Sequence, residues 1–226
     1  MQEHADAYRS LRARVTEVVR ATDPARMEEP APACTGWRAK DVLAHLVGVP
    51  ADVAADRMEG VATDAWTQAQ VEARLDVPVD DLLAEWNALG PGFEERLASL
   101  PGSIAGQPVF DAWTHEHDFR SAIGAPGARE GDALDLGWAW FVGGHGRTLT
   151  AQGRPALRVV SEAGEEVLGE GEPAATVRAS RFDLLRAMTG RRSETEIAAF
   201  DWDPAPRPDL LLVIPIFRMR TEPLAE

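Results

Sequence analysis

Two side chains that can bind a metal ion stand four residues apart in the sequence, Asp111 and His115. In a helix, residues at this spacing lie one above the other on the same face, so both can reach one ion. An upstream histidine, His45, can supply a third ligand from a second helix. Two nitrogens and one oxygen, with coordination positions left open, suit zinc or another first-row divalent ion that binds a reacting molecule. The alternative is a solvated helix face, because this spacing often arises by chance.

The helix that carries the pair is expected over about residues 108–123, and its other side chains bear on this choice. Apolar residues cover several of its sides: Phe110, Trp113, Phe119 and Ile123. A helix of this kind is mostly buried. A buried carboxylate or imidazole without a partner is costly, and a shared ion satisfies both Asp111 and His115. This pattern favours the metal site over the solvated face.

Apolar residues at helical spacing predict four more helices in the first two thirds of the chain. They are expected over about residues 4–22, 37–60, 79–100 and 132–149. His45 lies beside the apolar stripe of the second of these, at the border of the core. Gly90-Pro91-Gly92 predicts a kink or an interruption in the third, and the glycine-rich segment 143–146 predicts the end of the last.

The apolar period changes from 3.6 residues to 2 beyond Gly153. Short β-like runs follow at 156–161, 166–168 and 174–179, with helices at 181–188 and about 194–200. The expected fold is therefore α+β, with a bundle of four or five helices followed by a small α+β domain that has an antiparallel sheet. The expected domains are residues 1–151 and residues 152–226.

Composition excludes several classes of function. The chain has 226 residues and a net charge of −14, which disfavours binding to nucleic acid or to anionic lipid. Its polar N-terminus shows no signal peptide, and its longest apolar run is too short to span a membrane. The single cysteine, Cys34, fits a reducing cytoplasm. Cys34 precedes a predicted helix start, where a thiolate can be stabilised, but a small semi-buried residue is the simpler interpretation.

Two segments of the chain resemble the mycothiol-dependent maleylpyruvate isomerase family. They read CTGWRAKDVLAHL at residues 34–46 and FDAWTHEHDFRSAIGAPG at residues 110–127. The stretch 178–193, followed by FDWDP at 200–204, is similar to that family's second domain. The resemblance spans nearly the whole chain and implies a DinB-like up-down four-helix bundle followed by a small α+β domain.

The resemblance also implies which residues bind the metal. In the family, the histidine of the Trp-x-x-x-Asp-Val-x-x-His-Leu helix is a ligand, and here that residue is His45. The acidic residue and the histidine four positions later complete the set, and here they are Asp111 and His115. The family's isomerase has Glu where this chain has Asp111. The shorter carboxylate draws the ion toward the helix or holds it through water.

Other residues are candidates for the surroundings of the site. Trp37 and Trp113 flank the expected ligands and can line a cofactor pocket, although tryptophans are more often core residues. Arg191 and Arg192 can orient a carboxylate through their guanidinium groups, with a solvated helix face as the alternative. Asp118 can accept the second ring N–H of His115, or form an ordinary ion pair.

The function that the resemblance implies is that of a cytoplasmic, metal-dependent enzyme that uses mycothiol as co-substrate. Zinc is the expected ion, and it lowers the pKa of the thiol. The enzyme is expected to act as an isomerase or a thiol transferase on a small electrophilic or unsaturated acid, as a monomer or homodimer. Two alternatives stay open: a metal-dependent hydrolase with Glu116 or Asp118 as general base, and a non-catalytic metal- or ligand-binding member of the family.

Overall fold

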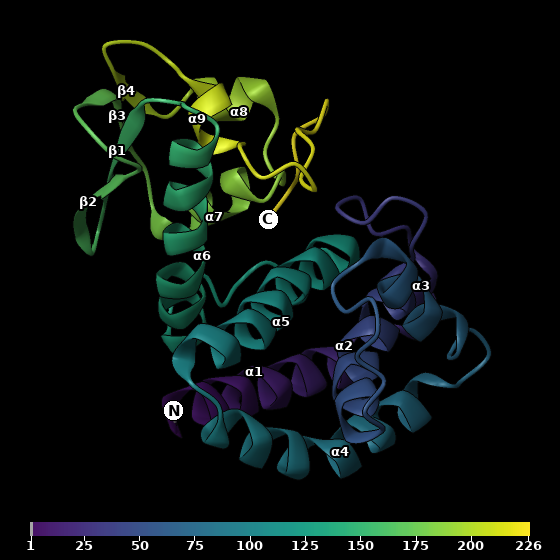
Figure 1. Ribbon diagram of the computed structural model, residues 1–226. Coiled ribbons are helices and arrows are strands. Elements are labelled where there is room, and N and C mark those ends of the chain that lie inside the picture. Colours follow the sequence, from purple (N-terminus) through teal and green to yellow (C-terminus); the bar gives the residue numbers. More distant parts are fainter. Residues whose placement is uncertain (1) are drawn as a thin grey trace. The chain divides into compact units, whose positions relative to one another are not determined.

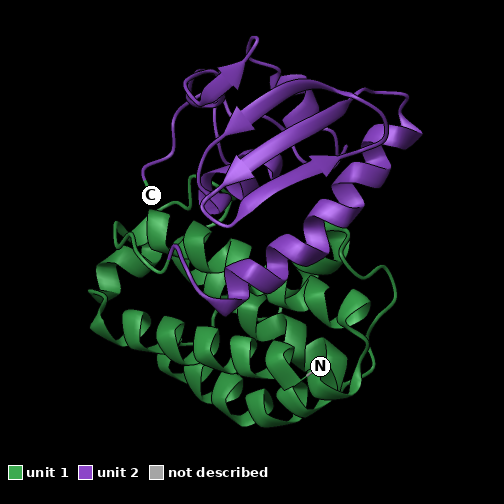
Figure 2. Ribbon diagram, turned by 90° about the vertical axis from the view of Figure 1, so that its left-hand side faces the viewer, with its two compact units in different colours: residues 1–128, 226 green, residues 129–225 purple. Residues whose placement is uncertain are grey.

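The structure is a computed structural model that describes residues 2–226. The chain divides into two compact units, one ending at residue 128 and one covering residues 129–225 (Figure 2). Helix α6 (Asp132–Ala151) clusters with the second unit, whereas the boundary expected from the sequence, after residue 151, placed it in the first. No helix within residues 2–226 is long and apolar enough to cross a membrane.

The first unit is built on four long helices (Figure 1). They are α1 (Gln2–Ala21), α2 (Ala39–Ala54), α4 (Val79–Ser99) and α5 (Gly102–Ile123). Helices α1 and α2 each contact both α4 and α5, which closes a four-helix bundle. Two shorter elements, the 3-10 helix η1 (Pro24–Glu28) and α3 (Asp64–Glu72), both contact α2. The predicted helical bundle is confirmed, and α3 is an element that periodicity did not predict.

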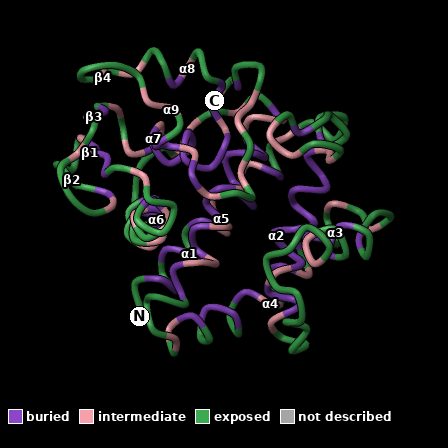
Figure 3. The backbone as a smooth tube through the Cα atoms, turned by 45° about the horizontal axis from the view of Figure 1, so that its top comes forward, coloured by how far each residue is buried: buried purple, intermediate pink, exposed green. Residues whose placement is uncertain are grey.

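The core of the bundle is the apolar stripe of each long helix (Figure 3). Its fully buried members include Leu11, Leu43, Val47, Trp86, Leu97 and Phe119. A polar contact inside this core joins α4 to α1, because the indole N–H of Trp86 donates to the hydroxyl of Tyr8 at 2.9 Å. Burial at helical spacing on every long helix is what holds the bundle together.

Helix α4 runs without interruption through the Gly90-Pro91-Gly92 segment, so the predicted interruption does not occur. Gly90 is needed for a contact with α1 instead. A Cβ at this position would lie 2.5 Å from the guanidinium carbon of Arg12. The Arg12 side chain passes over Gly90 to reach the buried carboxylate of Glu94, with Nη2 2.8 Å from Oε1.

The second unit contains a four-stranded sheet in the order β2-β1-β3-β4. The strands are β1 (Ala156–Ser161), β2 (Gly164–Leu168), β3 (Pro173–Arg178) and β4 (Asp201–Asp203). The α+β class is confirmed, but the prediction of an antiparallel sheet is wrong, because β1 pairs with β3 in parallel. Helices α7 (Arg181–Met188), α8 (Glu194–Ala198) and α9 (Pro208–Leu211) complete the unit.

The parallel pairing follows from the connection between β2 and β3. Strand β2 returns antiparallel to β1, and the chain then crosses the start of β1 to reach its other edge. Gly169 makes this crossing with a φ of +90°, and a Cβ there would lie 3.4 Å from Cα of Ala156. Helix α6 packs on the crossing at Gly146, where a Cβ would meet the backbone nitrogen of Gly169 at 3.0 Å. The glycines of segment 143–146 thus lie inside α6, not at its end as predicted.

Helix α6 also buries a histidine that lowers the stability of the fold in acid. His145 is fully buried and its Nε2 lies 3.0 Å from the carbonyl oxygen of Leu211, to which it donates. Burial lowers the pKa of His145 from 6.5 to about 4. Because this pKa is lower in the folded chain, the unfolded chain takes up the proton first as pH falls. Stability is therefore lost between pH 6.5 and about 4, and this group causes no further loss below that range.

We predict that His145→Gln makes the protein less sensitive to acid. The glutamine amide can donate to the same carbonyl but does not titrate. The free energy of unfolding, measured by urea denaturation at pH 7 and pH 4.5, should fall in the wild type by about 2–3 kcal/mol more than in the variant. All other titrating groups are common to both proteins. An equal fall of the free energy of unfolding in the two proteins would contradict the lowered pKa of His145.

Candidate metal centre

The bundle brings the three predicted ligands together. His45 lies in the middle of α2, Asp111 and His115 lie one turn apart on α5, and these two helices are in contact. Nε2 of His45 is 3.3 Å from Oδ2 of Asp111, and Nε2 of His115 is 3.7 Å from Oδ1. Each imidazole therefore faces a different oxygen of the same carboxylate. One ligand atom from each side chain lies within 4.8 Å of the other two, as binding of a single ion requires.

The burial of these side chains fits a bound cation. The side chain of His45 is 2% exposed, and among the described residues its Nε2 has no hydrogen-bond partner of suitable geometry. A buried polar nitrogen without a partner is costly, and a metal ion would satisfy it. The side chain of Asp111 is 34% exposed and that of His115 is 14% exposed. Solvent or a small ligand can therefore reach the centre from the side of Asp111.

The electrostatics of the two histidines differ. Burial alone would lower the pKa of His45, but the negative charge of Asp111 and the hydrogen bond between Nδ1 and Gln70 more than offset it, so that this pKa is raised. Burial and the neighbouring charge of His45 lower the pKa of His115. Proton uptake by the metal-free site therefore occurs at His45 before His115. A cation that binds there displaces this proton.

A chain of hydrogen bonds behind His45 fixes the orientation of its ring. Nδ1 of His45 is 2.7 Å from Oε1 of Gln70, and Nε2 of Gln70 donates to Asp52 at 2.7 Å. Asp52 is paired in turn with Arg57 at 2.8 Å. Because the amide of Gln70 donates to Asp52, its oxygen is left to accept from Nδ1–H of His45. This contact directs Nε2 toward Asp111.

Gln70 belongs to α3, and sequence analysis missed both the helix and the residue. Two features of the sequence indicate α3 and its contact with α2. Thr63 caps α3 by accepting from the backbone N–H of Trp66, as threonine before a helix often does. Gly48 interrupts the apolar run of α2, and a Cβ there would lie 2.5 Å from Cβ of Gln70. Because Gly48 has no side chain, Gln70 can pack close enough to α2 to contact His45.

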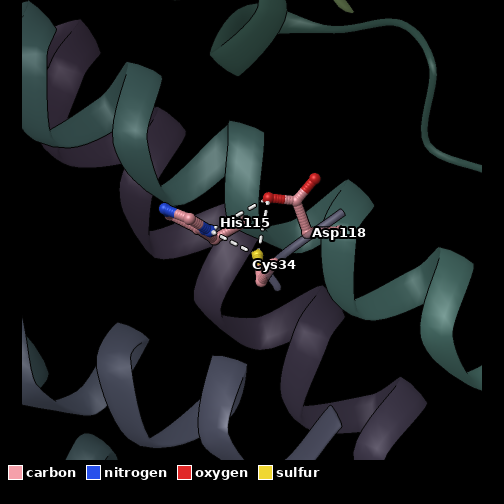
Figure 4. Close-up of side chains that lie close together, drawn as sticks. All are labelled: Cys34, His115 and Asp118. Atoms are coloured by element: carbon pink, nitrogen blue, oxygen red, sulfur yellow. Dashed lines mark hydrogen bonds and ion pairs between the residues drawn. The ribbon is translucent and has the colours of Figure 1, made fainter. Parts of the chain in front are cut away.

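The other ring nitrogen of His115 faces a second cluster (Figure 4). Nδ1 of His115 is 3.1 Å from Oδ2 of Asp118, which is fully buried. This is the contact expected for Asp118, and it directs Nε2 of His115 toward Asp111. The thiol of Cys34 lies 3.4 Å from the same oxygen of Asp118 and 3.9 Å from Nδ1 of His115. Cys34 is half-buried, as interpreted from the sequence, but it borders the site.

Cys34 and Trp37 are presented by a loop that backbone hydrogen bonds hold closed. The N–H of Ala39 donates to the carbonyl of Glu29, and the N–H of Ala31 donates to that of Trp37, at 2.9 and 2.8 Å. The indole ring of Trp37 lies 5.7 Å from the ring of His45 and 6.3 Å from that of His115. Trp37 is therefore placed beside the predicted ligands.

The remaining predicted site residues lie elsewhere. Trp113 is 1% exposed, and its ring packs 4.8 Å from that of His117, so it is a core residue on another face of α5. Arg191 and Arg192 belong to the second unit. Arg192 pairs with Asp183 at 2.8 Å, and Arg191 donates to the carbonyl of Thr189. Contact of Trp113 with a cofactor, and of both arginines with a substrate, stay predictions.

Comparison with known proteins places the chain among relatives of one enzyme. The family model of the mycothiol maleylpyruvate isomerase N-terminal domain matches residues 8–120, half of the chain. Two crystal structures are similar, one of the mycothiol-dependent maleylpyruvate isomerase and one of a histidine-to-alanine mutant of it. Each has a TM-score of 0.63 and 13% identity, and covers 91% of this chain and 95% of the other, so the likeness is one of fold. No curated protein matches this chain.

We predict that Gln70→Leu weakens metal binding without dismantling the bundle. Leucine fills similar space but cannot accept from Nδ1–H of His45, so the ring loses the contact that selects its tautomer. Loss of such an outer partner should weaken zinc binding by about 10- to 100-fold, measured by competition with a chelating dye. Nitrogen chemical shifts should show Nδ1 of His45 protonated in the wild type and a mixture of tautomers in the variant.

The matched control is Gln2→Leu, the same substitution on the exposed start of α1, where the Gln2 amide donates to Asp6 on its own helix. The control should bind zinc like the wild type. Equal zinc affinities in Gln70→Leu and the wild type would show that Gln70 does not position His45.

Proposed function

Because the chain belongs to the family of the mycothiol maleylpyruvate isomerase N-terminal domain, we propose that it is a metal-dependent isomerase that uses a low-molecular-weight thiol, mycothiol, as co-substrate. The observation that carries the metal dependence is the convergence of His45, Asp111 and His115, with a buried nitrogen of His45 that has no hydrogen-bond partner among the described residues. The substrate class is a small unsaturated acid.

The roles of the residues follow from their contacts. His45, Asp111 and His115 would hold the ion, and their donor set of two nitrogens and one oxygen suits zinc. Gln70 and Asp118 orient the two imidazoles from behind. Once bound, the ion lowers the pKa of the thiol so that thiolate exists at neutral pH.

The reaction needs no nucleophile from the protein. The thiolate adds to one carbon of an activated cis double bond, and the former double bond becomes a single bond that can rotate. Elimination of the thiolate then restores the double bond in the trans configuration. The thiol is regenerated, so that no oxidant or second substrate is consumed. The protein binds and orients the thiol and the substrate, and its site lowers the pKa of the thiol.

A hydrolytic mechanism is disfavoured by the surroundings of the site. Such a mechanism needs a carboxylate near the ion that can accept a proton from water. Glu116 is fully buried and is bound by two guanidinium groups, from Arg14 at 2.6 Å and from Arg120 at 2.9 Å. Asp118 is occupied by His115. Both candidates for the general base are therefore engaged in other contacts.

The aspartate in place of the family's glutamate is compatible with direct metal binding. The two oxygens of Asp111 lie 3.3 and 3.7 Å from the nearest nitrogens of the two histidines. Ligand atoms of a tetrahedral zinc site are separated by about 3.3 Å for bonds of about 2.0 Å. Asp111 thus reaches both imidazoles without the extra methylene group of glutamate.

We predict that His45→Ala and His115→Ala each remove the bound metal when made in a Cys34→Ser background, in which no thiol near His115 can bind zinc. Purified wild-type protein and Cys34→Ser should each contain close to one equivalent of zinc by elemental analysis, and each double variant only background. His4→Ala, which removes a histidine of the first unit in α1, is the control and should keep its metal. Unchanged zinc content in the two site variants would refute the proposed centre.

Catalysis is tested separately, by following isomerisation of maleylpyruvate in the presence and absence of mycothiol. We expect turnover only with the thiol, and a loss of turnover in the variant that combines His45→Ala with Cys34→Ser, in parallel with its loss of zinc. Turnover without any thiol would contradict the proposal and favour a hydrolase-like use of water. A zinc-loaded protein with no thiol-dependent turnover would identify a non-catalytic member of the family.

A further inference from the structure

The three side chains of Figure 4 have the geometry of a second metal site. The ligand atoms are Sγ of Cys34, Nδ1 of His115 and Oδ2 of Asp118. Nδ1 lies 3.1 Å from Oδ2, and Sγ lies 3.4 Å from Oδ2 and 3.9 Å from Nδ1. Tetrahedral zinc with bonds of about 2.0–2.3 Å to oxygen, nitrogen and sulfur places such atoms about 3.3–3.6 Å apart. The observed separations span that range, so an ion can bind all three with shifts of a few tenths of an ångström.

The cluster is held in place from two sides. Asp118 and His115 lie on the same face of α5, and Asp118 is fully buried. Cys34 is fixed by its own loop, because its N–H donates to the carbonyl of Ala31 and its carbonyl accepts from the N–H of Trp37. The ligands are therefore organised before an ion arrives, while the half-buried thiol leaves a path from solvent.

We propose that Cys34, His115 and Asp118 form a second site for a thiophilic divalent cation, such as zinc, cadmium or cobalt, and that this site competes with the first centre for His115. Sulfur selects for soft and borderline metals over magnesium or calcium. The ion replaces the thiol proton of Cys34, which leaves to solvent, and forms bonds to Sγ, Nδ1 and Oδ2. No electron is transferred.

The competition follows from the chemistry of one imidazole ring. A neutral imidazole has one nitrogen that carries a proton and one that carries a lone pair. The first centre uses Nε2 of His115, which requires the proton on Nδ1, facing Asp118. The second site uses Nδ1, which requires the proton on Nε2. One neutral ring cannot serve both ions, so an ion at Cys34 withdraws His115 from the first centre.

This competition has a consequence that rests on the proposed function. An ion held by Cys34 leaves only His45 and Asp111 for the first centre, which then binds the catalytic ion weakly. The second site would thus make the enzyme sensitive to thiophilic metals, with Cys34 as the residue that confers the sensitivity.

The sequence allows an unambiguous spectroscopic test, since Cys34 is the single cysteine of the chain. Cobalt(II) bound to a thiolate shows a sulfur-to-metal charge-transfer band in the near ultraviolet, and cobalt bound only to nitrogen and oxygen does not. The metal-free full-length protein, kept reduced with a phosphine and free of added thiols, is titrated with cobalt(II). Any such band reports an ion on Cys34.

We expect the band in the wild type and a severalfold stronger band in His45→Ala at the same sub-saturating cobalt concentration, because that variant loses the competing centre. Cys34→Ser should abolish the band and still bind one equivalent of cobalt at the first centre. Binding should stay at one equivalent in the wild type. Cys34→Ser is a small change at a half-buried position, and its circular dichroism and melting curve confirm the fold.

Two results would overturn the inference. Absence of the band in His45→Ala, with that variant folded, would show that Cys34 and Asp118 only form hydrogen bonds with His115. Two equivalents of cobalt in the wild type, with the band present, would refute competition for His115. Neither result bears on the first centre, whose failure is read separately from the zinc content of His45→Ala and His115→Ala in the Cys34→Ser background.

Discussion

The contact between α2 and α5 is the constraint on which the candidate site depends. It places His45, from one helix, against Asp111 and His115, from another, with Nε2 of His45 3.3 Å from Oδ2 of Asp111. The apolar burial of the long helices stabilises this arrangement. A rigid core thus holds two imidazoles and a carboxylate in a geometry that suits a cation.

Gln70 and Asp118 determine which ring nitrogen of each proposed histidine ligand faces Asp111. Gln70 directs the lone pair of His45, and Asp118 directs that of His115, so both Nε2 atoms face Asp111. The same Asp118 also contacts Cys34. One side of α5 therefore carries two overlapping donor sets that share one imidazole. Under the proposed competition, the position of a single ring proton on His115 decides which donor set binds a metal.

The sequence predicted what depends on periodicity and on matched motifs. Apolar spacing identified the bundle helices, and the resemblance identified His45, Asp111 and His115, which the fold brings together. Contacts between segments that are distant in the sequence could not be predicted in this way. Helix α3 is short and weakly amphipathic, so Gln70 could not be placed behind His45. The parallel pairing of β1 with β3 depends on the path by which the chain crosses β1 at Gly169. Segment 143–146 resembled a helix end because glycine is typical of helix ends, but here Gly146 allows close contact between α6 and Gly169.

His45, Asp111 and His115 are proposed to bind one catalytic ion that a thiol can reach. An anomalous difference map at the zinc edge, from crystals of the zinc-loaded protein soaked with mycothiol or an analogue, would show this ion directly. One peak is expected at bonding distance from Nε2 of His45, a carboxylate oxygen of Asp111 and Nε2 of His115, with sulfur density of the thiol on the open side. A map without a peak between these three side chains, or with zinc only beside Cys34, would contradict the proposed centre.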